Sequence, residues 1–164
     1  MNNRPMMTIK RSRFAKGFDT VTLLAYLAGI IYLIFMWGQL PDEVPGHYNG
    51  AGEVDRWGSK WELILLPVIA LFLFAFMAFM ERHPEWHNYM NLNENNIEFQ
   101  YKNSMLLLNV LKNECVLFFT YLHFKTVQVA LGKAASLGIG FLPIFIGITI
   151  GSLIYFAIRS FKNK

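Results

Sequence analysis

Apolar residues in this chain are gathered into long blocks and do not recur once per helical turn. Three blocks, Thr20–Leu40, Trp61–Met80 and Leu137–Ile158, are each about as long as a bilayer-crossing helix. At about 1.5 Å per residue, crossing the hydrocarbon core takes roughly 20 residues. Because these blocks are apolar on every side, they predict membrane-spanning helices and exclude the one-sided helices of a soluble domain.

A fourth spanning helix is predicted within Asn95–Gly132, where a polar first half is followed by an apolar second half. We expect its lipid-crossing part to begin near Cys115, with the preceding polar residues at the cytoplasmic edge. This part contains His123 and Lys125. A lysine at mid-membrane costs about 2.5–3.5 kcal/mol. Neighbouring helices should therefore shield this segment from lipid.

Polar and aromatic residues in this fourth segment recur with helical spacing. Glu114, Phe118, Tyr121, Lys125 and Gln128 follow one another at intervals of four, three, four and three. Residues so spaced share one helix face, which should point into the bundle. The polar members (Glu114, Tyr121, Lys125 and Gln128) are a candidate intramembrane site. Lys125 is equally well explained as an anchor that extends its amine to the outer interface.

Composition supports a membrane protein. Apolar residues make up 54% of the 164 residues and charged residues only 16%, against about 25% in soluble proteins. The net charge of +4 does not indicate a nucleic-acid partner, because the basic residues collect beside the apolar blocks. The bilayer is therefore the expected partner. The single cysteine excludes an internal disulfide.

The basic residues also predict the topology, because they favour the cytoplasmic side of a membrane. Both termini and the connection between the second and third helices carry them, which predicts four helices with both ends inside. The loop Pro41–Lys60 and the connection around Lys133 are then outside. The first block is too long for a signal-peptide core and is read as a retained helix. The residues expected to be cytoplasmic are Arg4, Lys10, Arg11, Arg13, Lys16, Arg82, Lys102, Lys112, Arg159, Lys162 and Lys164.

The expected fold class is thus an all-α multi-pass protein of the cell membrane, with one membrane domain over residues 1–164. Residues 18–80 form its first unit, and residues 81–164 an interfacial loop with the last two helices. His83, Glu85 and His87 lie close together in this loop, but Pro84 breaks their spacing, so a solvated loop is favoured over a metal site. No metal or cofactor is expected.

The outer loop Pro41–Lys60 predicts a compact hairpin that covers the outer ends of the helices. Its prolines stop the first helix and hold the chain extended. Gly50 and Gly52 permit the positive φ angles of a tight reversal. Ser59 is placed to cap the next helix, and Trp57 lies where the chain returns to the bilayer interface.

Two interpretations apply to the charged residues of this loop. His47, Glu53 and Asp55 supply an imidazole and two carboxylates, which would suffice for a divalent cation with added water. The favoured interpretation is structural: His47 hydrogen-bonds across the hairpin, and Asp55 pairs with Arg56 or Lys60.

The loop resembles the signature of a bacterial membrane family, the domain of unknown function 1648, found at the start of SdpI-like proteins. The residues that carry the resemblance are Pro41, Val44, Pro45, His47, Tyr48, Asn49, Gly52, Asp55, Trp57, Gly58, Ser59 and Lys60. The resemblance implies immunity to a secreted toxic peptide, or its sensing together with a membrane-protein partner. The expected recognition surface is Pro45, His47, Tyr48, Asn49, Gly52, Asp55, Arg56, Trp57, Gly58 and Lys60.

Catalysis is not expected, because no serine–histidine–acid set, paired membrane carboxylates or zinc-helix motif is present. We therefore expect a non-enzymatic envelope protein, for which the SdpI-like resemblance implies a role in immunity to a toxic peptide, in peptide sensing or in stress response. Alternatives are a small transporter or channel component that uses the intramembrane polar face, or a structural subunit. Gly147 and Gly151 have the spacing of a close helix-packing motif, within one chain or between the copies of a homo-oligomer, and packing alone is the favoured role.

Overall fold

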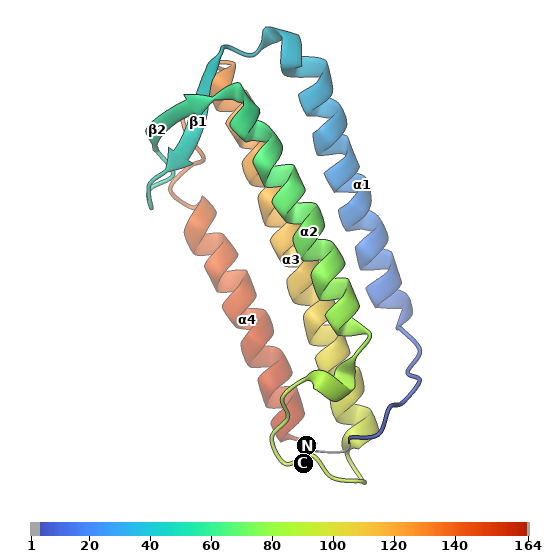
Figure 1. The fold of residues 1–164 in the computed structure, drawn as a ribbon. Coiled ribbons are helices and arrows are strands. Elements are labelled where there is room, and N and C mark those ends of the chain that lie inside the picture. The colour runs from blue at the N-terminus through green and yellow to red at the C-terminus, as the bar shows by residue number, and fades with distance from the viewer. Residues whose placement is uncertain (1–3, 164) are drawn as a thin grey trace.

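The computed structural model describes residues 4–163 and contains four long helices that run side by side (Figure 1). Each is long and apolar enough to cross a bilayer, the second when counted with the short helix Lys60–Ile64 that precedes it, so the predicted four-helix membrane fold is confirmed. The described helices are α1 (Arg13–Met36), α2 (Leu65–Glu81), α3 (Ile97–Ala130) and α4 (Phe141–Phe161).

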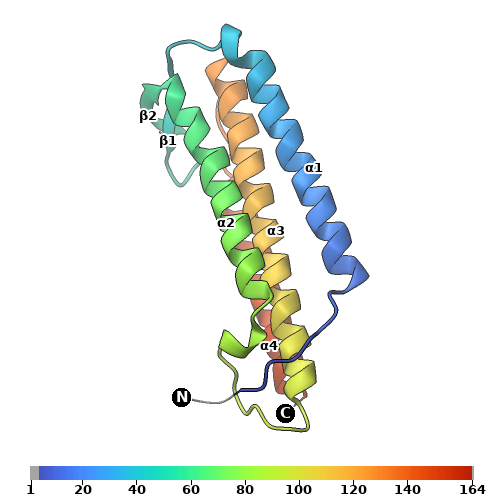
Figure 2. The same cartoon turned by 45° about the vertical axis from the view of Figure 1, so that its right-hand side comes forward.

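Helix α3 is the centre of the bundle and packs against α1, α2 and α4. It has 34 residues and is therefore about 51 Å long, well beyond the thickness of a hydrocarbon core. Its bounds lie within two residues of the predicted segment. The N-terminal part of α3, which begins at Ile97, extends beyond the end of α2 at Glu81 (Figure 2).

Helix α4 is displaced along α3 relative to α1 and α2. At the start of α4, Phe141 stacks on Tyr121, and near its end the carbonyl of Ser160 accepts a hydrogen bond from Gln100. The α3 residues that bond to α1 run from Asn109 to Gln128 and so lie nearer the hairpin end of α3. The displacement is seven to nine residues, or roughly 10–13 Å at about 1.5 Å per residue.

The outer loop is an ordered hairpin, as predicted. Strand β1 (Glu43–Tyr48) pairs with strand β2 (Val54–Ser59) in an antiparallel sheet, the strand component of an otherwise helical molecule. Gly52 turns the chain with a φ of +79°, whereas Gly50 does not adopt positive φ, so only one of the two expected glycines is needed for that purpose. The Ser59 hydroxyl accepts a hydrogen bond from the Trp61 amide, as expected for a cap.

The hairpin lies against the outer ends of the helices and is held at three points. The Tyr48 hydroxyl donates to Oγ1 of Thr126 on α3 at 3.3 Å. The backbone amide of Leu137, in the α3–α4 connection, donates to the Gly52 carbonyl at 2.9 Å. Val44 is fully buried in a small core with Leu63 and its neighbours. This explains why the loop packs as a lid and does not project into solvent.

Both ends of the described chain lie at the end of the bundle opposite the hairpin (Figures 1 and 2). We call this the inner end and the hairpin end the outer end. An even number of spans requires this arrangement, as the sequence predicted. The assignment of the inner end to the cytoplasm still rests on the basic residues.

We expect a cysteine at Ala135 to be labelled by an impermeant thiol reagent in intact cells, and a cysteine at Glu94 to be protected. Ala135 is exposed in the outer α3–α4 connection, and Glu94 is exposed at the inner end. Both are placed in a Cys115→Ser background, because Cys115 is the one native thiol. Permeabilised cells should label both. If intact cells labelled Glu94→Cys but not Ala135→Cys, the topology would be the opposite of the predicted one.

Candidate functional site

A cavity of about 330 Å³ lies beneath the hairpin, between the two strands and α2, α3 and α4. Its floor is apolar because α2, α3 and α4 present leucine and phenylalanine side chains there. Its rim is polar because the hairpin contributes charged and amide groups. The floor includes Leu63, Leu66, Phe118, Leu122, Phe141 and Leu142, and the rim includes His47, Asn49, Arg56 and Glu62.

Two side-chain pairs organise the hairpin at the rim. Nδ1 of His47 lies 2.6 Å from Oδ1 of Asp55, so the predicted hydrogen bond of His47 across the hairpin is confirmed. Arg56 donates from both terminal nitrogens to the Glu62 carboxylate, at 3.2 and 2.8 Å. Nη2 also donates to the Gly46 carbonyl at 2.7 Å. The hydrogen bonds to Glu62 raise the pKa of Arg56, so this side of the rim keeps its charge.

The predicted pairing of Asp55 with Arg56 or Lys60 is wrong. Asp55 pairs with His47, and Lys60 pairs with Asp42 at 3.1 Å. The physical reason is that Arg56 bonds the Glu62 carboxylate and the Gly46 carbonyl, while Lys60 bonds Asp42. The strand register is irregular on both sides of His47, and its ring meets Asp55 although its Cα is paired with that of Arg56.

The three residues considered for a cation do not converge. Glu53 accepts a hydrogen bond from the amide of Asn49 at 3.1 Å, away from the pair of His47 and Asp55. Residues 4–163 contain no group of three histidine, cysteine or acidic side chains placed to hold a metal ion. The expected absence of a metal stays a prediction.

The predicted recognition surface divides into two groups. Six of its ten residues line the cavity beneath the hairpin, and burial raises the pKa of one of them, Tyr48. Trp57 is exposed and lies outside the cavity lining. The six residues are Pro45, His47, Tyr48, Asn49, Gly52 and Arg56; Asp55, Trp57, Gly58 and Lys60 do not line the cavity.

The predicted intramembrane polar face is split between two neighbours. Oε1 of Glu114 accepts a hydrogen bond from Ser152 of α4 at 2.5 Å, and Tyr121 stacks on α4. Gln128 instead donates to the hydroxyl of Tyr32 on α1 at 2.5 Å. Lys125 is half-buried and forms no ion pair within the described chain. The structure therefore gives the transport hypothesis no single polar site.

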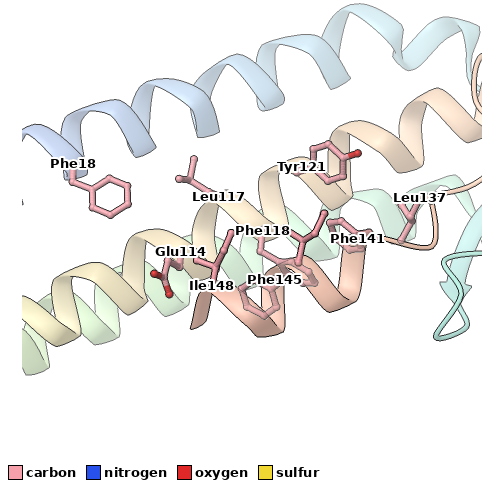
Figure 3. A pocket seen from close by; sticks show the side chains of 12 residues that line it. Phe18, Glu114, Leu117, Phe118, Tyr121, Leu137, Phe141, Phe145 and Ile148 are labelled. Carbon is pink, nitrogen blue, oxygen red and sulfur yellow. The ribbon is translucent and has the colours of Figure 1, made fainter. Parts of the chain in front are cut away.

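Glu114 and Tyr121 instead line a larger groove of about 700 Å³ between α1 and α4, with α3 as its floor. Phe18 projects from α1 across this groove toward Leu117, and Ile148 faces it from α4 (Figure 3). The walls are almost entirely apolar. Gly147 and Gly151 lie on exposed positions of α4, where an added Cβ would meet no atom within 4 Å, so self-association through them stays a prediction.

Sequence reasoning missed a buried charge cluster where α1, α2 and α3 meet. Its centre is Lys112 of α3, whose side chain is fully buried. Its Nζ lies 2.7 Å from Oε2 of Glu81 and 3.0 Å from Oδ1 of Asp19. The ring of Phe74 covers the ammonium at 4.7 Å. A buried ammonium requires such partners, because desolvation without them is costly.

Arg11 and two asparagines complete the cluster. Arg11 lies 2.7 Å from Glu81 and 2.6 Å from Asp19, so two cations face two carboxylates. Burial alone would lower the pKa of Arg11, but its hydrogen bonds to Asp19 and Glu81 raise it. Asn109 and Asn113 each donate to Oδ1 of Asp19 at 2.8 Å. The cluster thus ties the chain before α1 to three helices.

Lys112 was expected only as a basic residue at the cytoplasmic edge, and its full burial between two acids was not predicted. Counting basic residues treats every lysine outside an apolar block as solvated, and Lys112 precedes the apolar run. A signal was nevertheless available. Asn109, Lys112 and Asn113 are spaced three and four apart and so share one face of a helix. Asp19 and Glu81, single acids near the inner ends of the first two apolar segments, could serve as partners for this face.

Comparison with known families tests the family resemblance that the outer loop suggested. Residues 24–71 match the domain of unknown function DUF1648. This segment belongs to the DUF1648 family. The DUF1648 match covers most of α1, the whole hairpin and the start of α2, and lies inside the expected unit of residues 18–80. It therefore includes every hairpin residue that lines the cavity.

One curated relative is similar to this chain beyond the signature itself. It is an uncharacterized protein of Archaeoglobus fulgidus, 30% identical over 89 residues. The alignment covers 47% of this chain and 49% of the relative, so the chain spans about half the length of the relative that it matches. No solved structure matches the chain.

Proposed function

We propose that this protein is a non-catalytic membrane receptor that binds an amphipathic toxic peptide beneath its outer hairpin, for immunity or sensing. The observation that carries the proposal is the cavity under the DUF1648 hairpin, with its apolar floor and charged rim. A peptide with one apolar and one polar face offers matching surfaces to both. Immunity and peptide sensing are the roles that the SdpI-like resemblance implies.

The geometry of the cavity supports binding more than chemistry. The rim carboxylate of Glu62 is engaged in an ion pair with Arg56, and the Asp55 carboxylate, outside the cavity lining, lies 2.6 Å from Nδ1 of His47. A general acid or base needs a free position toward its substrate. The floor contributes aliphatic and aromatic side chains, which supply apolar contact area. Such a site holds a ligand by burial and orients it through the rim.

The test is a deletion strain challenged with a panel of amphipathic antimicrobial peptides. We expect deletion to increase sensitivity to at least one peptide and the intact chain to restore resistance. Leu122→Trp should not restore it, because the added ring fills the cavity floor. The matched control is Leu71→Trp, which adds the same volume on an exposed position of α2 outside the cavity.

Expression and thermal unfolding of both variants show whether they fold, and Leu142→Trp provides a second way to fill the cavity from α4. Unchanged sensitivity of the deletion strain to every peptide would contradict the proposal. So would full resistance with both cavity-filled variants. Incubation of the purified protein with the peptide should leave the peptide mass unchanged, and cleavage would show an enzyme.

A further inference from the structure

A separate cavity lies at the inner end of the bundle, between the start of α1, α3 and the end of α4. Its volume is about 310 Å³. One part of its wall is apolar, with Ile9, Met105 and Leu106. Another part is basic, with Lys10, Lys102 and Arg159. Basic and apolar walls thus meet at the end where the sequence places the cytoplasmic surface.

Positive charge is in excess in this inner cavity. Its one acid, Glu81, is neutralised by Arg11 and Lys112, each at 2.7 Å. Lys102 pairs with Glu98 outside the cavity lining. Lys10 and Arg159 have no carboxylate partner among residues 4–163. The cavity is therefore complementary to an anion.

The inner cavity lies along the same side of α3 as the apolar groove. Leu106 lines the cavity and Leu117 lines the groove. They are eleven residues apart, which is close to three helical turns, so they share one face of α3. Both spaces are flanked by α1 and α4, through Ala15 and Arg159 below and Phe18 and Ile148 above. The basic cavity and the apolar groove thus follow one another along α3, with Glu114, hydrogen-bonded to Ser152, between the levels of Leu106 and Leu117.

We propose that the inner cavity and the groove together form a binding site for one anionic phospholipid. The phosphate would lie against Lys10, Lys102 and Arg159, and an acyl chain would occupy the groove. A lipid is favoured because the two spaces together match an anion joined to a long apolar chain. Basic pockets between spanning helices on the cytoplasmic side are suited to anionic headgroups. This inference is independent of the peptide proposal, which concerns the outer end.

The headgroup contact is tested by titrating the delipidated full-length protein in detergent with phosphatidylglycerol or phosphatidylcholine and counting bound lipid by native mass spectrometry. We expect phosphatidylglycerol to bind preferentially. The double variant Lys102→Gln/Arg159→Gln should bind it about thirty-fold more weakly, or about 2 kcal/mol for two charges. The control Arg82→Gln/Lys162→Gln removes the same charge from exposed inner residues outside the cavity lining and should bind normally.

The acyl contact is tested by Ile148→Trp, which fills the groove while the basic residues stay in place. Its control is Ile150→Trp, because Ile150 is similarly exposed on α4 (49% against 54%) but lies outside the groove. Only Ile148→Trp should weaken phosphatidylglycerol binding. Equal binding of both lipids, equal loss in both charge variants, or full competition by inorganic phosphate would overturn the proposal. Unchanged binding in Ile148→Trp would overturn its acyl part.

Discussion

Replacing Lys112 by methionine is expected to destabilise the folded protein by about 3–5 kcal/mol. The side chain is fully buried and holds the carboxylates of Asp19 and Glu81 together. Methionine fills a similar volume but leaves the buried Glu81 and the partly buried Asp19 to share the single cation Arg11. Breaking a buried pair from one side costs about this much, because an unbalanced charge remains in a poorly solvated place. Unfolding in mixed micelles measures the loss.

A double variant that removes one cation and one carboxylate from the cluster supplies the decisive comparison. Lys112→Met/Glu81→Gln restores the charge balance, with Arg11 facing Asp19, and should recover most of the lost stability. The matched control is Lys102→Met, which removes an exposed lysine of the same helix that pairs only with Glu98. It should change stability by about 0.5 kcal/mol or less. If Lys112→Met were equally mild, the cluster would not hold the three helices together.

Gly52→Ala is expected to loosen the hairpin from the helices, at a cost of about 1–3 kcal/mol. Gly52 has a φ of +79°, which disfavours any residue with a Cβ. An added Cβ would also lie 2.8 Å from the carbonyl oxygen of Gly138, where the hairpin meets the α3–α4 connection. Amide hydrogen exchange over residues 43–59 should therefore become faster, and the overall unfolding midpoint should fall.

Gly50→Ala is the control for this change, because it lies in the same turn. Gly50 does not have positive φ, and an added Cβ would meet no atom within 4 Å. Alanine there should leave exchange and stability nearly unchanged, or raise stability slightly by restricting the unfolded chain. Equal protection of the hairpin in both variants would show that contact with the α3–α4 connection does not hold it.

The helices could be predicted from sequence because apolar blocks of bilayer length admit few alternatives in a chain of this size. The hairpin was also accessible, since Pro41 and Pro45 prevent helix and Gly52 permits the reversal. Its strand pairing and the ion pairs of Asp55 and Arg56 were not, because they depend on which side of the strand each residue faces. The pattern of residue types alone does not specify that register.

The site residues were less predictable for a related reason. The polar face from Glu114 to Gln128 was correctly spaced for a single helix, but spacing does not tell which neighbour lies at each level. The displacement of α4 gives Glu114 a partner on α4 and Gln128 a partner on α1. The burial of Lys112 was missed because its partners, Asp19 and Glu81, belong to other helices. The spacing of Asn109, Lys112 and Asn113 marks a polar helix face, but it does not tell which acids lie against that face.

The displacement of α4 along α3 also bears on how the molecule fits its membrane. The apolar lengths of α1 and α2 form one belt, and that of α4 forms another, shifted inward by roughly 10 Å at about 1.5 Å per residue. A flat bilayer of uniform thickness cannot match both belts of an upright bundle. The bundle must therefore tilt in the membrane. Otherwise, the bilayer beside α4 must become thinner on its outer side and thicker on its inner side. In either case, the resting orientation of the hairpin depends in part on the thickness and the lateral pressure of the membrane.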